Sequence, residues 1–349
     1  MLIARNRQPG GKIGPDVNPA TVATTMREIN EVGRTAFFVN QMRAEEMDRA
    51  APLYVDCFSK IFCNHVTEEM VQTMYKVLPD RGHWMALRTH YFDRVIKDAI
   101  RDEGVRQVVI LGSGLDCRPL RLYEAGVRYF EVDQPKILDY KTRKLKEAGY
   151  AAYPSAVLRV EYPPGYLGID LVSELEVLGL DPRVPTLYLW EGNTMYLPTD
   201  AATELLKTLL VRTPDALFAF DAMTPRIANP KGVVDTGDAS MDRALRGIFD
   251  GLSAGKPIWV GGWDVDATAT GLGYEIVAVG AGDELMREYR CTSNICDDVF
   301  DGDTYMAEIY TKLSKEYKFY VVRKVGTRPR RSPRRRCEKS TRSDAQLFS

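Results

Sequence analysis

The chain has 349 residues, of which 45% are hydrophobic and 27% charged, so it has the composition of a globular protein with a sizeable core. No apolar run approaches the roughly 18 residues that a membrane-spanning helix needs, and we expect no membrane span. The formal net charge is −1, but it is divided unevenly between the body of the chain and its C-terminal end.

Cysteine and histidine are too few and too scattered for a metal centre. None of the six cysteines belongs to a Cys-x-x-Cys pair, and the three histidines are spread along the sequence. We therefore predict no bound metal, and reduced, mostly buried thiols in a cytoplasmic protein.

The first hundred residues carry helical patterns. Residues 1–18 are partly basic and contain no apolar segment, unlike a secretory signal, so we expect a flexible N-terminus there. Apolar and charged residues then mix at helical spacing in residues 21–49, 67–78 and 84–101. These patterns predict a helical cap over about residues 19–103.

Beyond the cap, short β-rich runs alternate with helical ones. The seven β-rich runs are VRQVVILG, VRYFEVD, AVLRVEY, PTLYLWEG, ALFAFDAM, YEIVAVG and KFYVVRKV. Such alternation predicts an α/β fold with a mostly parallel sheet and helices on both faces. An insertion rich in Gly, Pro and Asp, at about residues 223–263, contains one helical segment near residues 241–252. Because it follows the carboxyl end of a strand, where such sheets bind ligands, we interpret it as a lid.

The C-terminal end differs in composition from the rest. Residues 326–349 contain eight Lys or Arg against two acidic residues, so they carry +6 and leave −7 on the remainder of the chain. So polar a segment is expected to be disordered. The tail could bind RNA, an acidic surface or an import receptor, and the alternative is a solvated tail with no specific role.

A glycine turn follows the first β-rich run. Gly112 permits a tight turn and Gly114 lets a ligand approach the backbone, but Cys117 stands where a dinucleotide-binding turn has its third glycine. Such a turn is poorly suited to a pyrophosphate. Asp133 ends the next run, nineteen residues after Gly114, and its carboxylate can accept hydrogen bonds from ribose hydroxyls. A ligand with a ribose and no phosphate points to S-adenosylmethionine rather than NAD.

Three segments carry a more specific resemblance: LGSGLDCRPLRL, YFEVDQPKILDYKTRKL and LGLDPRVPTLYLWEGNTMYLP. Together with GRTAFFVNQMRAEEMDRAAPLYVD and ALRTHYFDRVI, they resemble the leucine carboxyl methyltransferase family. This branch of the class I S-adenosylmethionine-dependent methyltransferases includes many small-molecule O-methyltransferases of secondary metabolism. The resemblance implies a methyltransferase domain over residues 19–325, with a Rossmann-like core of seven strands from about residue 104.

The resemblance also implies roles for individual residues. Arg88 would pair with the methionine carboxylate of the cofactor, Arg43 would be a second partner of that carboxylate, and Glu191 would lie near the amino group. Asp170 and Leu171 resemble a pair that meets the adenine. The residues assigned to the cofactor are Arg43, Arg88, Gly112, Gly114, Asp133, Asp170, Leu171 and Glu191.

Tyr196 and Asn193 are the candidates for contact with the substrate. The family usually has a hydrophobic pair where this chain has Asn193 and Thr194, which points to a different substrate. His90 is the one histidine near a site motif and is the candidate general base. A carboxylate acceptor needs no base, whereas a phenol usually does, so the scarcity of histidine favours a carboxyl acceptor.

Three functional alternatives stay open. The first is methyl transfer to a carboxylate or hydroxyl of a small molecule, and the second is methyl transfer to the C-terminal leucine carboxylate of a protein. The third is a cofactor-binding module without catalysis whose basic tail binds nucleic acid. A nicotinamide-dependent oxidoreductase is disfavoured by Cys117 and by the lack of a catalytic pair.

Overall fold

The computed structural model describes residues 19–75, 81–150, 153–161, 165–253, 259–282, 284–285 and 312–327. The flexible segment predicted for residues 1–18, and the basic tail beyond Thr327, lie outside the described residues.

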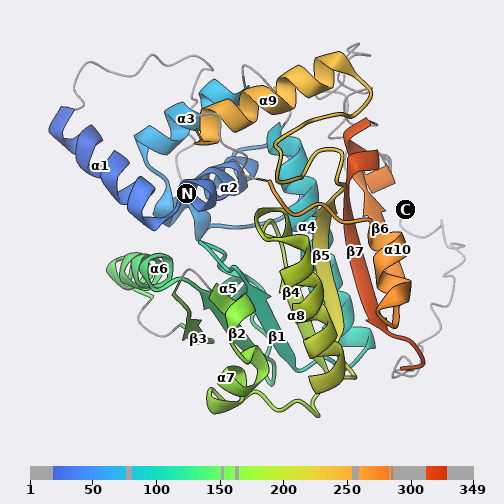
Figure 1. Cartoon of the computed structure of the whole chain (residues 1–349). Helices are drawn as coiled ribbons and strands as arrows, with labels where there is room; N and C mark the ends of the chain where they lie inside the picture. Colours follow the sequence, from blue (N-terminus) through green and yellow to red (C-terminus); the bar gives the residue numbers. More distant parts are fainter. Residues whose placement is uncertain are drawn as a thin grey trace, which may run out of the picture.

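Seven strands form one sheet in the order β3-β2-β1-β4-β5-β7-β6 (Figure 1). The strands are β1 (Gln107–Leu111), β2 (Arg128–Asp133), β3 (Ser155–Arg159), β4 (Thr186–Trp190), β5 (Leu217–Met223), β6 (Tyr274–Ala281) and β7 (Tyr317–Lys324). Neighbours among β1 to β5 are parallel, and β7 is antiparallel to both β5 and β6. Each strand coincides with a predicted run, which confirms the mostly parallel α/β sheet. The position of β7 between β5 and β6 was not predicted, because strand order depends on pairing between distant residues.

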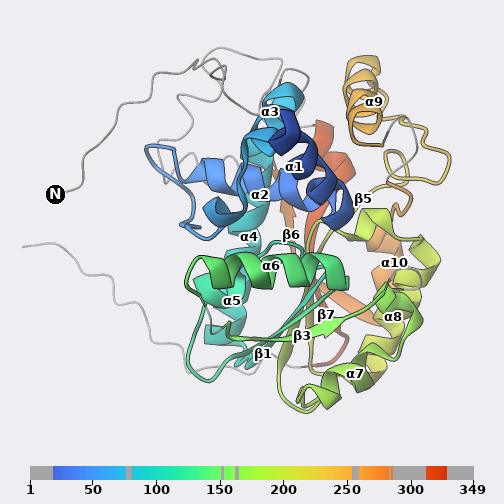
Figure 2. The same cartoon turned by 90° about the vertical axis from the view of Figure 1, so that its left-hand side faces the viewer.

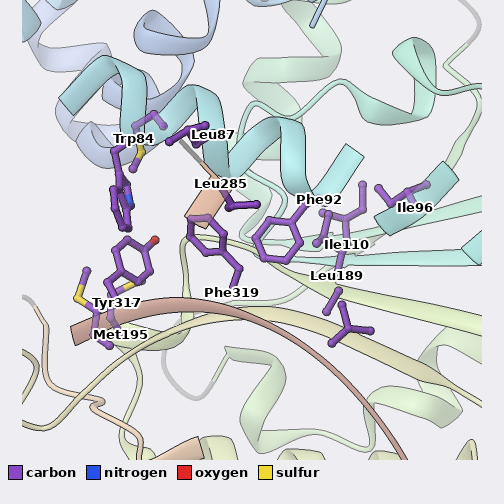
Figure 3. Close-up of a cluster of buried hydrophobic side chains, with 14 of the residues drawn as sticks. Trp84, Leu87, Phe92, Ile96, Ile110, Leu189, Met195, Leu285, Tyr317 and Phe319 are labelled. Atoms are coloured by element: carbon purple, nitrogen blue, oxygen red, sulfur yellow. The ribbon is translucent and has the colours of Figure 1, made fainter. Parts of the chain in front are cut away.

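Alternate residues of the central strands face opposite layers of helices. Ile110 and Leu189 belong to the apolar cluster under α4 (Arg81–Asp102), as Figure 3 shows. Val109 and Tyr188 belong to the second cluster, on the other face. The helices of that second cluster are α7 (Leu171–Val177), α8 (Thr199–Arg212) and α10 (Val265–Gly271). A sheet covered on both faces needs apolar residues at every central position, which explains the continuous apolar runs in the sequence.

The remaining N-terminal elements lie over the edge of the sheet at which the parallel strands have their carboxyl ends (Figures 1 and 2). They are α1 (Pro19–Val32), α2 (Arg34–Glu46), η1 (Ser59–Phe62) and α3 (His65–Tyr75). The single helical stretch predicted for residues 21–49 is divided at Gly33, whose φ of 141° is outside the helical range. A third apolar cluster joins these elements to α6 (Pro135–Glu147). The helix α4 packs on the face of the sheet itself. Of the predicted helical cap, only α1, α2, η1 and α3 therefore lie beyond the sheet.

The insertion after β5 contains the expected helix. This helix, α9 (Ala239–Ser253), lies over the same edge of the sheet as α1 to α3 in both views (Figures 1 and 2). Three short elements complete the description: α5 (Arg118–Arg121), η2 (Gly165–Gly168) and η3 (Thr194–Tyr196). Among the described helices, none is long and apolar enough to span a bilayer.

Candidate active site

A cavity of about 650 Å³ lies at the carboxyl ends of the parallel strands. Its wall includes Gly112 after β1, Asp133 at the end of β2, Glu191 after β4 and Met223 at the end of β5. This is the edge at which doubly wound sheets bind ligands. The predicted residues in the wall are Arg43, Arg88, Gly112, Gly114, Asp133, Glu191, Asn193 and Tyr196.

The glycine turn has the backbone that the sequence predicted. Gly112 and Gly114 have φ values of 63° and 53°, which residues with a side chain rarely adopt. A Cβ atom on Gly112 would lie 2.7 Å from Cγ of Asn193, so the turn and the segment after β4 approach each other closely. The Ser113 hydroxyl between the two glycines is buried in the wall and has no hydrogen-bond partner among the described residues.

Asp133 is held at the turn by two backbone donors. The Gly114 N–H donates to Oδ2 at 2.6 Å, and the Gln134 N–H donates to Oδ1 at 2.7 Å. Each carboxylate oxygen therefore retains a lone pair for a further donor, as two ribose hydroxyls would require. Burial raises the pKa of this carboxyl in spite of the two backbone hydrogen bonds.

Glu191 lies among three arginines. Its Oε1 atom accepts hydrogen bonds from Nη2 of Arg43 at 2.9 Å and from Nε of Arg88 at 3.1 Å. Its Oε2 atom lies 2.6 Å from Nη1 of Arg118. Burial opposes ionisation, but the charges of the three arginines outweigh it and lower the pKa of Glu191 to about 2. The carboxylate is therefore ionised at neutral pH.

Arg88 is bound more extensively than the sequence indicated. Besides its contact with Glu191, its Nη1 atom donates to the Tyr317 hydroxyl at 2.9 Å and to Oδ2 of Asp221 at 3.3 Å. Asp221 also accepts hydrogen bonds from the Tyr317 hydroxyl and from the Gly192 N–H. A Cβ atom on Gly192 would lie 3.0 Å from the guanidinium of Arg88, so the glycine leaves room for this side chain.

Sequence reasoning missed four residues of this charged group: Asp116, Arg118, Asp221 and Tyr317. Asp116 lies in the wall 3.6 Å from Nη1 of Arg43, and the buried Arg118 bridges it to Glu191. One signal was available for Asp221, because a carboxylate inside the apolar run ALFAFDAM is unusual unless it has partners. The others depend on tertiary contacts that no local pattern reveals.

Asp170 and Leu171, which were predicted to meet the adenine, lie outside the cavity wall. The Asp170 carboxylate accepts a hydrogen bond from the Ser173 N–H as the N-cap of α7 and pairs with Arg212, while Leu171 is buried in the core under the sheet. The wall near the ribose site instead contains Ile137, Val160 and Leu167.

The position of Asp170 outside the cavity wall gives a first prediction. Replacing Asp170 by alanine is expected to lower the thermal midpoint slightly, because the α7 cap and the Arg212 pair are lost. The affinity for S-adenosylhomocysteine should stay within about twofold of wild type, since no contact with the cavity changes. Calorimetric titration measures this, and a tenfold loss of affinity would restore the adenine assignment.

His90, the candidate general base, lies outside the described cavity wall. Its Nδ1 atom lies 2.7 Å from the carbonyl oxygen of Leu53. Burial is the main cause of a lowered pKa at His90.

The far end of the cavity, beyond Glu191, is largely apolar. We call it the acceptor end, and its residues are Met85, Met195, Tyr196, Met223, Trp259 and Tyr317. Figure 3 shows Tyr317 and Met195 next to each other at the start of β7. The side-chain oxygen Oδ1 of Asn193 accepts a hydrogen bond from the Trp190 indole N–H at 3.1 Å. This bond fixes the orientation of the Asn193 side-chain amide between the glycine turn and the acceptor end.

Comparison with known proteins agrees with this geometry. The family model for leucine carboxyl methyltransferase matches residues 36–210. A relative from Mycobacteroides abscessus is 32% identical over 261 residues, covering 68% of this chain and 84% of the relative. A relative from Mycolicibacterium smegmatis is 36% identical over 212 residues, covering 55% of this chain and 63% of the relative. The names of both relatives assign them to the S-adenosyl-L-methionine-dependent methyltransferases.

A solved structure supports the fold alone. The crystal structure of a DUF574 family protein from Streptomyces avermitilis has a TM-score of 0.55 and 15% identity, covering 85% of this chain and all of that chain.

The sheet and the matched family model together define the class, which is the class I methyltransferase fold. Within that class, the chain belongs to the leucine carboxyl methyltransferase family. The predictions of fold class and family are confirmed. The chain spans less than two thirds of the M. smegmatis relative, and the matches do not identify a methyl acceptor.

Proposed function

We propose that this chain is a cytoplasmic O-methyltransferase of small-molecule metabolism that transfers the methyl group of S-adenosylmethionine to the carboxylate of a small apolar acid. The observation that carries the choice of a carboxylate is the lack of a suitable base. None of the described residues in the cavity wall is a histidine, lysine or cysteine. A carboxylic acid, with a pKa near 4, is already ionised at neutral pH and needs no base.

The acidic residues in the wall are poor bases for a hydroxyl acceptor. Arginines lower the pKa of both Asp116 and Glu191, despite burial, and Asp133 lies at the ribose end. Burial raises the pKa of Tyr317 well above its usual range, and its hydroxyl already donates to Asp221. None of Asp116, Asp133, Glu191 and Tyr317 is therefore placed and poised to take a phenolic proton.

The residues present fit the cofactor. Asp133 has lone pairs for the ribose hydroxyls, the Ser113 hydroxyl has no hydrogen-bond partner among the described residues, and the carboxylate of Glu191 can receive an ammonium group. S-adenosylmethionine supplies a methyl group on a positively charged sulfur. Attack by a carboxylate neutralises both charges, and the apolar acceptor end favours a reaction in which charge disappears. A wall that positions the acceptor oxygen against the methyl group can supply several kcal/mol.

Replacing Asp133 by alanine tests the cofactor site. The loss of hydrogen bonds to a charged group is expected to weaken S-adenosylhomocysteine binding by about 1–3 kcal/mol, roughly 5- to 150-fold. Calorimetric titration of wild type and variant measures the effect, with NADH as the control ligand. Tight binding of NADH, or unchanged affinity in the variant, would contradict the assignment.

The acceptor class can be tested by identifying the bond that joins the methyl group to the product. Methyl transfer from labelled S-adenosylmethionine to apolar carboxylic acids should yield methyl esters, which release methanol in mild alkali, whereas methyl ethers from phenols do not. Peptides ending in leucine form the comparison set for the protein-carboxylate alternative. Products stable to alkali would overturn the choice of a carboxylate, and transfer to the peptides alone would overturn the small-molecule acceptor.

A further inference from the structure

Arg118 is a fully buried arginine directly behind the cavity wall. It begins the short helix α5, its side chain has no exposed surface, and it does not line the cavity. Two carboxylates that do line the cavity, Asp116 and Glu191, both contact the same nitrogen of its guanidinium. The mechanism of methyl transfer described above gives Arg118 no part.

The rest of the guanidinium is fixed from α4. Nε donates to Oδ1 of Asp93 at 2.7 Å, and Nη2 donates to the carbonyl oxygen of Thr89 at 3.1 Å. Nη1 is left to face Asp116 and Glu191, with Oε2 of Glu191 at 2.6 Å. A planar guanidinium presents its donors in a rigid fork, so these contacts set the orientation of both carboxylates.

Asp93 is itself held by a second buried arginine. Arg121 donates to both carboxylate oxygens of Asp93, at 2.6 Å and 2.8 Å, and its Nε atom lies 3.4 Å from Asp56. Opposite charges therefore alternate from Asp56 to the cavity wall. Such an arrangement costs desolvation and is weak evidence for stability alone, so a functional reason is worth seeking.

Two adjacent buried carboxylates would not both stay ionised without a cation between them. Burial opposes ionisation of Asp116 and Glu191, and the charge of Arg118 is the largest influence in the other direction for both. Arg43 from α2 and Arg88 from α4 add positive charge on the cavity side, whereas Asp221 from β5 opposes it near Arg88. Arg118 is the arginine that contacts both carboxylates from behind, away from the ligand.

We propose that Arg118 is a positioning residue that holds Asp116 and Glu191 together as an ionised pair, and that this pair receives the ammonium group of the cofactor. The inference rests on the proposed function, since it takes the amino acid part of S-adenosylmethionine as the ligand. It adds Asp116 to the ammonium site and gives α5 a role in cofactor binding.

The test compares two ligands that differ in their amino acid part. S-adenosylhomocysteine carries the ammonium and carboxylate groups, and 5′-methylthioadenosine keeps the nucleoside and lacks both. Binding of each to wild type, Arg118→Met and Arg118→Lys is measured by calorimetry between pH 5.5 and 8. Arg183→Met is the control, because this exposed arginine pairs with Asp181 away from the cavity.

The expected result is a selective and pH-dependent loss. Arg118→Met should weaken S-adenosylhomocysteine binding by about tenfold or more at pH 7, and 5′-methylthioadenosine binding by less than about threefold. The loss should grow as the pH falls, because the pKa values of Asp116 and Glu191 rise without Arg118 and the carboxylates become protonated. Arg118→Lys should show the same selectivity with a smaller loss of affinity, because lysine keeps the positive charge but lacks the planar guanidinium group.

An equal loss for both ligands, or a loss independent of pH, would show a merely structural role and overturn the inference. If Arg118→Met does not fold, Arg118→Lys and Asp93→Asn carry the same comparison, and the absence of selectivity in both would also overturn it. Wild-type protein that binds 5′-methylthioadenosine but not S-adenosylhomocysteine would refute the ammonium site alone. Wild-type protein that binds neither ligand would refute the proposed function as well.

Discussion

Replacing Glu191 by glutamine is expected to abolish measurable S-adenosylhomocysteine binding and to lower the free energy of unfolding by about 3–5 kcal/mol. The side chain keeps its shape but loses the charge that Arg43, Arg88 and Arg118 surround. Breaking a buried ion pair on one side leaves the other side uncompensated, and here three guanidinium groups are affected. Urea denaturation gives the stability, and calorimetry gives the affinity.

The effect on stability should depend on pH in a defined direction. The pKa of Glu191 is lowered to about 2 in the folded protein, from an ordinary value near 4.5 in the unfolded chain. Its contribution is therefore fully present above about pH 4.5 and is lost as the pH falls toward 2. The difference between wild type and Glu191→Gln should shrink over that window. A difference that stays constant from pH 5 to pH 3 would contradict the ionised state assigned to Glu191.

An exposed glutamate provides the matched control. Glu176 at the end of α7 pairs with Arg212 at the surface, so Glu176→Gln removes one charge without touching the buried cluster. Exposed pairs contribute little, and this variant should bind S-adenosylhomocysteine as wild type does.

Where a local pattern fixes the backbone or the end of a strand, the predicted residues line the cavity. Gly112 and Gly114 need positive φ angles, and Asp133 and Glu191 end strands whose apolar runs are unambiguous. All four lie in the cavity wall because the ends of neighbouring parallel strands meet there.

Where position depends on a loop or on tertiary contacts, a local pattern does not indicate whether a residue reaches the cavity. Asp170 lies outside the cavity wall and forms the N-cap of α7. Arg118 and Tyr317 come from α5 and β7, and only the assembled sheet brings them to the same group of charges. His90 shares a helix with Arg88, but two residues of helix rotation separate their directions, and only Arg88 lines the cavity.

The second large effect is expected at Gly261, two residues after Trp259 of the acceptor end. A Cβ atom there would lie 1.9 Å from the carbonyl oxygen of Leu197 and 2.9 Å from that of Thr194. Both are backbone atoms, so no side-chain rotation can relieve the contact. The segment is also bound tightly to η3, since the N–H groups of Val260 and Gly261 both donate to the carbonyl oxygen of Met195, at 2.8 Å and 3.0 Å.

Gly261→Ala must therefore move the segment away from η3, and with it Trp259, which lines the acceptor end. We expect a loss of about 2–3 kcal/mol in the free energy of unfolding, in the range of overpacked cores. S-adenosylhomocysteine affinity should stay within about threefold, whereas methyl transfer should fall at least tenfold, because a small displacement of the acceptor costs about 10²-fold in a positioned reaction.

Gly271→Ala is the matched control for Gly261→Ala. Gly271 ends α10, and a Cβ atom on it would meet nothing within 4 Å, so alanine should leave both stability and transfer close to wild type. Equal losses of S-adenosylhomocysteine binding and methyl transfer in Gly261→Ala would mean that the segment supports the whole cavity. A loss confined to transfer would separate the two ends physically, with the cofactor between Asp133 and Glu191 and the acceptor between η3 and Trp259.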